Sequence, residues 1–225
     1  IFQLILFPFP SSLKTLYYYK DCSGRRRIMQ EKILITFFNK GLRSYIEVDL
    51  CAKCPRNDNK GCCGFYSPIF YPTDLVYLLE NKPDLIEYIL GLPDLTVLDS
   101  SITINNSIDS DSYKCRFHTD KGCLLEQSLR ESICRHFVCP GVAWEKEEKL
   151  ADWRRFFNLL TDYEINLNNK IAENLKKKGL SLRNFDKLDI FFHKMMLSFY
   201  EETRILPDFF NDYPKAETYT LYRTL

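Results

Sequence analysis

The sequence predicts an α+β fold in which helix predominates. In it, a loop-rich cysteine and metal core with a small β-hairpin packs against a C-terminal helical hairpin. Three observations predict this fold. Eight of the nine cysteines form two clusters between residues 51 and 139. The turn-forming stretch Asp120-Lys121-Gly122 separates two short strand-like pieces in the second cluster. Apolar side chains recur at three- and four-residue steps through the last third of the chain.

The chain is expected to divide into three segments. Residues 1–28 are interpreted as a non-native or disordered upstream segment, because the chain begins with isoleucine and its first methionine is Met29. The arginines at 25–27 also follow the opening apolar stretch, whereas a signal peptide carries its positive charge first. Residues 29–142 are predicted to form a cysteine-cluster metal-binding domain, and residues 143–225 a helical C-terminal region.

The elements expected before and within the first cluster are short. Apolar side chains at helical spacing predict a helix over residues 29–42. Residues 45–50 alternate in polarity and predict an extended segment that leads into the cluster. Residues 57–64 are rich in turn formers, so the Cys-Cys pair within them is expected on a loop.

Short elements are also expected up to the end of the second cluster. A capping side chain predicts a helix over residues 73–79, and Pro83 suits the first turn of another helix. Residues 92–112 are predicted to be a loop with weak strand content. Residues 113–126 are predicted to form the hairpin, and residues 128–137 a short helix.

The clearest helical pattern lies in the C-terminal region. Apolar side chains mark one face of a helix over residues 153–175, and Gly179 can end it. Ser181 can cap a second helix with apolar positions over residues 185–199. The tail after Pro207 has no clear period.

Charge and hydropathy give expectations about partners and compartment. The chain has 31 Lys and Arg against 30 Asp and Glu, so no basic excess indicates a nucleic-acid partner. The opening apolar stretch of residues 1–10 is interrupted by Pro8 and Pro10 and falls short of the about 20 residues that span a bilayer. We therefore expect a cytoplasmic protein with no nucleic-acid or membrane partner. The sequence does not identify a protein partner or substrate.

The clustered cysteines are candidate metal ligands. They follow the patterns C-x2-C-x7-C-C and C-x7-C-x10-C-x4-C. The eight candidates are Cys51, Cys54, Cys62, Cys63, Cys115, Cys123, Cys134 and Cys139. Four thiolates saturate a tetrahedral zinc ion or a [4Fe–4S] cluster, so eight could fill two such sites. Alternatively, four bind metal and the others pack as small buried side chains. The expected cofactor is zinc or an iron–sulfur cluster.

Other interpretations of these residues are weighed beside metal binding. A disulfide framework is typical of short secreted domains poor in helix, and this chain is long and helical in its second half. His118 and His136 are possible nitrogen ligands, whereas His193 is remote from both clusters in sequence. Arg130 and Arg135 could offset thiolate charge or donate to sulfur, or could form an ordinary solvated helix face. No carboxylate pair or nucleophile motif identifies a catalytic residue.

A set of motifs spans residues 47–141. They are Cys51, Cys54, Cys62-Cys63, Tyr71-Pro72-Thr73-Asp74-Leu75, Cys115-Arg116-Phe117, Gly122-Cys123, Arg130 and Cys134-Arg135-His136-Phe137-Val138-Cys139. This combination resembles the zinc- or iron-chelating cysteine-cluster proteins of the CxxCxxCC (YkgJ) type. The chain departs from the family pattern in two places. The spacer before Cys62 has seven residues, and Glu131 stands where proline is common in the family.

The resemblance implies a metal-binding protein with a cysteine-ligated zinc or iron–sulfur centre, whose biochemical role is otherwise unassigned. It also implies an alternative, an enzyme: an Fe–S-dependent oxidoreductase or a relative of protein lysine N-methylases, which are longer chains. In the first case the metal holds a loop-rich core together. In the second, the centre takes part in chemistry, and the sequence leaves this choice open.

Overall fold

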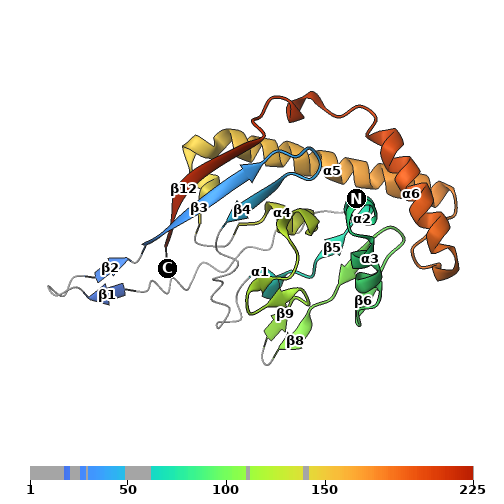
Figure 1. Ribbon diagram of the computed structural model, residues 1–225, viewed down its shortest axis with the longest axis horizontal. Coiled ribbons are helices and arrows are strands. Elements are labelled where there is room, and N and C mark those ends of the chain that lie inside the picture. Colours follow the sequence, from blue (N-terminus) through green and yellow to red (C-terminus); the bar gives the residue numbers. More distant parts are fainter. Residues whose placement is uncertain are drawn as a thin grey trace.

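The computed structural model describes residues 18–20, 26–28, 30–48, 62–109, 112–138 and 142–224. Helix exceeds strand in a mixed α+β arrangement, which confirms the predicted fold class. Figure 1 shows the long helix α5 (Ala151–Lys177) passing behind a three-stranded sheet and continuing toward α6 (Leu188–Glu202). The two helices contact each other, as expected for the C-terminal helical hairpin.

The three-stranded sheet joins the two ends of the described chain. Its central strand β3 (Gln30–Phe38) pairs antiparallel with β4 (Tyr45–Val48) on one side and β12 (Ala216–Thr224) on the other. In the turn between β3 and β4, Gly41 has a φ of 62°, which glycine adopts without steric cost. Because β12 belongs to the expected C-terminal helical region, that region and the expected cysteine-cluster domain share one sheet.

The prediction of a helix over residues 29–42 is wrong, because most of this stretch is strand β3. Ile33, Ile35 and Phe37 are buried, and Leu34 between them is 50% exposed. This is the period of two that places alternate side chains on opposite faces of a sheet. The short sequence fits both periods, and pairing with two neighbouring strands decides between them.

Buried side chains form two hydrophobic cores. The sheet core consists of Ile33, Ile35, Phe37, Ile46, Val138, Val142, Trp144, Leu150, Trp153, Phe156, Phe157, Leu160, Phe210 and Leu221. The helical core consists of Phe70, Leu75, Val76, Leu78, Leu85, Ile86, Ile89, Ile102, Ile104, Cys115, Phe117, Leu125, Leu167, Ile171, Leu175, Leu182, Phe191 and Met195. Helix α5 contributes to both, so it connects the sheet to the part of the molecule that holds the cysteines.

The helical core is built from short elements packed against α5 and α6. Helices α2 (Pro72–Asn81) and α3 (Pro83–Leu90) confirm the two helices expected there. A small antiparallel sheet has the order β5-β7-β6. Its strands are β5 (Ile69–Phe70), β6 (Leu95–Val97) and β7 (Ile102–Ile104).

The elements around the described cysteines are short. They are α1 (Cys62–Phe65), β8 (Ser107–Asp109), β9 (Ser112–Lys114), β10 (His118–Thr119), β11 (Gly122–Cys123), the 3-10 helix Gln127–Leu129 and α4 (Ser132–His136). The β10–β11 pair confirms the predicted hairpin, and Gly122, the first residue after its turn, has a φ of 97°. The helix expected over residues 128–137 is divided into the 3-10 helix and α4.

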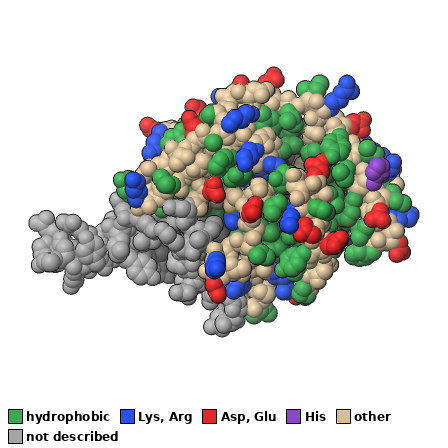
Figure 2. Space-filling view, viewed as in Figure 1, with side chains coloured by type: hydrophobic (Ala, Val, Ile, Leu, Met, Phe, Trp, Pro, Cys, Tyr) green, Lys and Arg blue, Asp and Glu red, His purple; other side chains and the backbone are tan. Residues whose placement is uncertain are grey.

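Strands β1 (Tyr18–Lys20) and β2 (Arg26–Ile28) pair with each other and lie apart from the two cores (Figure 1). The other residues of the segment 1–28 lie outside the described residues, so the interpretation of that segment stays a prediction. Among the described helices, none has the length and apolar character needed to cross a bilayer. On the face shown in Figure 2, basic and acidic side chains are interspersed among hydrophobic ones.

Candidate metal centre

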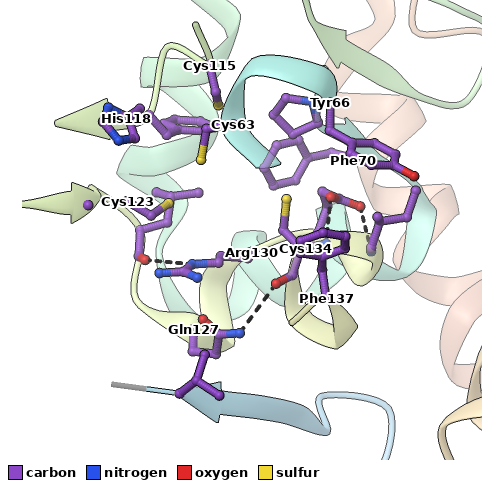
Figure 3. Close-up of a pocket in the computed structure, with 17 residues that line it drawn as sticks. Cys63, Tyr66, Phe70, Cys115, His118, Cys123, Gln127, Arg130, Cys134 and Phe137 are labelled. Atoms are coloured by element: carbon purple, nitrogen blue, oxygen red, sulfur yellow. Dashed lines mark hydrogen bonds between the residues drawn. The ribbon is translucent and has the colours of Figure 1, made fainter. Parts of the chain in front are cut away.

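Cysteines from both clusters line a small cavity. Cys63, Cys115, Cys123 and Cys134 line it, and Figure 3 shows their sulfur atoms facing the same space. Its volume is about 70 Å³, several times the roughly 10–15 Å³ needed for one water molecule. Cys63 belongs to the first cluster and the other three to the second, so the fold brings together cysteines that are distant in the sequence.

Separate segments of backbone hold the four cysteines in place. Cys63 lies on α1, and its carbonyl oxygen accepts a hydrogen bond from the amide of Cys115 at 2.6 Å. Cys123 lies on β11, directly opposite His118 of β10. Cys134 lies on α4 and is a free thiol. Because each cysteine is carried by a different piece of backbone, a group bound by all four would tie these pieces together.

Hydrogen bonds hold the backbone around Cys134 from two sides. The Glu131 carboxylate caps α4 by accepting from the amides of Ile133 at 2.8 Å and Cys134 at 2.9 Å. The Gln127 side-chain amide donates to the carbonyl oxygens of Ile46 at 2.7 Å and Cys134 at 3.3 Å (Figure 3). Glu131 stands where the resembling family commonly has proline, and here its side chain starts the helix that carries Cys134.

The electrostatics of the cavity disfavour negative charge. Burial, followed by the charge of Asp74, raises the pKa of Glu131 to about 6. Burial and the neighbouring Glu131 also raise the pKa of the Cys134 thiol strongly. A metal ion that binds Cys134 would have to displace the thiol proton, because the thiolate is the form that coordinates metal.

Aromatic side chains form much of the cavity wall. Phe70 and Phe117 are buried and stand edge to face, with ring centroids 6.3 Å apart. Tyr66 and Phe137 also line the cavity, with ring centroids 6.2 Å apart, and Tyr66 is 44% exposed. These apolar rings limit the access of water, so the thiols have few competing polar neighbours.

The two arginines beside Cys134 have different surroundings. Arg130 lines the cavity, and its Nε donates to the carbonyl oxygen of Leu125 at 3.0 Å. Arg135 is fully buried, so the interpretation that it lies on a solvated helix face is wrong. Its guanidinium donates to the Ser44 carbonyl oxygen and to Glu164, at 2.6 Å each, and is therefore directed away from the thiols.

Arg135 belongs to a buried ion cluster that the sequence did not reveal. Its members are Arg43, Asp74, Arg135 and Glu164. Arg43 contacts Asp74 at 2.7 Å, and Arg135 lies 3.8 Å from the same carboxylate. Burial acts to lower the pKa of Arg135, but the charges of Glu164 and Asp74 outweigh it and raise the pKa. The one signal in the sequence is Glu164 itself, a charged residue on the apolar face of the helix expected over 153–175.

The histidines are also separated by the fold. His118 lines the cavity and so stays a candidate nitrogen ligand. His136 does not line it, since its ring lies 5.0 Å from the Phe157 ring on the side of the sheet core. Burial, followed by the charge of Arg135, lowers the pKa of His136 well below its usual value. His193 is exposed on α6.

The remaining predicted ligands cannot be placed in this cavity. Cys51, Cys54 and Cys139 lie outside the described residues, and so does the side chain of Cys62. Within the described part of the chain, no three His, Cys, Asp or Glu side chains stand close enough together to hold one metal ion. The residues present still fit a cysteine-ligated group in chemistry, because four soft sulfur donors line a small apolar space.

Comparisons with protein-family models, curated protein sequences and solved structures found no match to this chain. The likeness to the zinc- or iron-chelating cysteine-cluster proteins therefore rests on the residues quoted for it, and family membership stays a prediction.

Proposed function

We propose that the protein binds a cysteine-ligated metal centre, zinc or iron–sulfur, at the cavity between its two cysteine clusters. One observation carries the proposal. Cys63, Cys115, Cys123 and Cys134 come from separate segments of the chain, and all four line one small apolar cavity. Thiolates are soft ligands that suit zinc and iron–sulfur clusters.

The other four predicted ligands are proposed as members of the same centre or of a second one beside it. Cys62 adjoins Cys63, and Cys139 follows the cavity-lining Phe137 by two residues. Cys51 follows Val48, which also lines the cavity, by three residues. Cys54 completes the C-x2-C pair with Cys51, a spacing typical of chelating pairs.

When bound, the metal would supply the cross-links that these short elements lack. Strands β10 and β11 have two residues each, and α4 has five, so local hydrogen bonding alone stabilises them weakly. Metal that binds the folded state and not the unfolded chain stabilises the fold by mass action. The proposed compartment is the cytoplasm, where thiols are kept reduced and available to metal.

Anaerobic purification followed by metal and sulfide analysis and an optical spectrum tests the proposal. Stoichiometric zinc without colour identifies a zinc centre, and iron with sulfide and a brown colour identifies an iron–sulfur centre. The absence of both metals, with the cysteines oxidised in pairs, would contradict the proposal and support the disulfide alternative.

The chain offers a matched control for the ligand assignment. Cys134→Ser is expected to lower the metal content, because this thiol faces the cavity. Cys22→Ser makes the same chemical change at the one cysteine outside both clusters and is expected to leave the metal content as in the wild type. Equal metal content in the two variants would remove Cys134 from the ligand set.

A second candidate function, an iron–sulfur oxidoreductase, is favoured by a groove beside the cavity. The groove has a volume of about 580 Å³, and Cys123 and Arg130 line both it and the cavity. Small-molecule sites are commonly about 300–1,000 Å³ in volume, so a reactant could reach the centre from this side. A centre that takes up and releases one electron reversibly would support this function, and a redox-inactive zinc centre would exclude it.

A further inference from the structure

We propose that Glu164 of helix α5 is a positioning residue of the metal centre: through its ion pair with Arg135 it fixes the helix α4 so that Cys134 faces the cavity. Glu164 lies outside both cysteine clusters and makes no contact with the cavity. The inference rests on the metal centre proposed above and adds to it a residue that no cysteine motif contains.

The first step of the argument is the short length of α4. It has five residues, Ser132–His136. Helices shorter than about 12–15 residues are marginal on their own in water, so contacts from outside decide where α4 lies and how it is rotated. The capping carboxylate of Glu131 fixes the start of this helix, and the Gln127 side-chain amide donates to the carbonyl oxygens of Cys134 and Arg135 near its end.

The second step is that Arg135 restrains the rotation of α4 against the rest of the fold. Its planar guanidinium donates from Nη1 to the Ser44 carbonyl oxygen and from Nη2 to Glu164 Oε1, at 2.6 Å in each case. A guanidinium has its donors in a rigid fork, so two such contacts leave it little freedom. Successive side chains of an α-helix are about 100° apart around the axis. The direction of Arg135 therefore sets the direction of Cys134.

The third step is that Glu164 is itself held firmly. It is 2% exposed and lies between Leu160 and Leu167 on the buried face of a 27-residue helix. One turn further on, Asn168 accepts a hydrogen bond from the backbone amide of Thr73 at 2.9 Å, which ties α5 to α2. The longest helix of the described chain thus provides a fixed point for one of its shortest.

Stability alone does not require this ion pair. Replacing a buried ion pair by apolar side chains of similar size is often neutral or stabilising, whereas removing one partner leaves a buried unpaired charge. A purely structural pair and a positioning pair therefore give different results when both partners are replaced together. This difference makes the positioning role testable.

The main test uses Co²⁺ as a coloured probe of thiolate ligands, titrated anaerobically into the metal-free chain. Glu164→Gln is expected to weaken Co²⁺ binding about 10- to 100-fold, the usual effect of losing an outer partner of a ligand. Its thiolate-to-cobalt absorption is also expected to be weaker, because Cys134 no longer faces the ion. Circular dichroism shows whether the variant is folded.

Glu173→Gln is the matched control. Glu173 lies on the same helix, is 65% exposed and pairs with Lys177 at 3.2 Å. The same chemical change at this position is expected to leave Co²⁺ binding at the wild-type value. A second readout needs no metal: iodoacetamide is expected to alkylate Cys134 faster in metal-free Glu164→Gln than in metal-free Glu173→Gln.

The double variant Arg135→Leu with Glu164→Leu separates positioning from packing. It is expected to regain thermal stability and still to bind Co²⁺ weakly, and it carries the test if Glu164→Gln does not fold. Wild-type Co²⁺ affinity in the double variant, or in folded Glu164→Gln, would overturn the positioning role of Glu164 and leave the proposed metal centre standing. A wild-type chain without any thiolate-to-cobalt absorption would instead overturn the metal centre and, with it, this inference.

Discussion

The two ends of helix α5 pack in hydrophobic cores of different character. Its first half contributes Trp153, Phe156 and Phe157 to the sheet core, where aromatic rings pack on a sheet. Its second half contributes Leu167 and Ile171 to the helical core, beside the cysteine cavity. Between the two halves lies the buried ion cluster.

The difference shows that apolar burial and buried ion pairs have different roles in this molecule. Apolar burial in the sheet core is non-directional and roughly proportional to area, so it supplies stability with little demand on angle. The buried ion cluster requires specific angles and distances, and it joins α2, α4, α5 and the backbone at Ser128. We therefore expect changes in the sheet core to affect stability, and changes in the ion cluster to affect metal binding as well.

The largest expected effect on stability is in the sheet core. Phe156 is fully buried and packs against Tyr213 with ring centroids 4.9 Å apart. Phe156→Ala is expected to lower the free energy of unfolding by about 3–5 kcal/mol, measured by urea denaturation. Asn158→Ala, at an exposed position of the same helix, should change it little. A loss of metal affinity in folded Phe156→Ala would contradict the proposed division of roles.

A change in the buried ion cluster is expected to have a somewhat smaller effect on stability. Asp74→Ala removes the carboxylate 2.7 Å from Arg43. Loss of a partner from a buried pair costs about 3–5 kcal/mol. We expect the lower end, because Arg43 keeps its hydrogen bonds to the carbonyl oxygens of Ser128 and Arg130.

Asp84→Ala is the control for this variant. Asp84 forms an ion pair with Lys82 in which both side chains are more than half exposed, and its removal is expected to leave the urea midpoint unchanged. Equal midpoints for Asp74→Ala and Asp84→Ala would show that the buried ion cluster contributes nothing beyond an exposed pair.

Metal removal is expected to distinguish the two regions without any mutation. After chelation, amide hydrogens of β10, β11 and α4 should exchange roughly tenfold faster or more, which corresponds to about 1.4 kcal/mol. Amides of β3 and β12 should exchange at unchanged rates, because their nine-residue ladder lies in the sheet core. The exchange rates are measured by mass spectrometry. An equal increase in the exchange rates of both regions would mean that the two cores open as one unit.

The smallest effect is expected on the outer face of the sheet. The hydroxyls of Thr36 and Thr218 lie 2.9 Å apart in an exposed cross-strand pair. Thr218→Ala is expected to lower the free energy of unfolding by about 0.5 kcal/mol. Thr220→Ala on the same strand is the control. It removes the same side chain, but the residue opposite Thr220 is Leu34, which has no hydroxyl. The difference between the two variants gives the contribution of the hydroxyl pair.

Parts of the fold were predictable because their signals are local. The helix expected over 153–175 is present within α5, since one apolar face persists over several turns. The β10–β11 hairpin was predicted from Asp120-Lys121-Gly122, because a turn sequence acts over a few residues. Pro83 likewise begins α3, where its missing amide hydrogen is not needed.

The sheet was not predictable in the same way. Strand β3 carries apolar side chains that fit a helix as well as a strand, and β12 in the tail showed no clear period. Their pairing brings Phe38 opposite Ala216, which are distant in the sequence. Such pairing depends on neighbours that a local pattern does not contain.

By itself the sequence determined the chemistry available to this protein. It supplied two groups of cysteines at chelating spacing, a helix-dominated fold and the hairpin that carries Cys123, because residue types and local periods are written along the chain. Only the tertiary structure decided which of these residues meet. It brought Cys63 to the second cluster and paired Arg135 with Glu164, since contacts between distant segments form when their apolar faces are buried together.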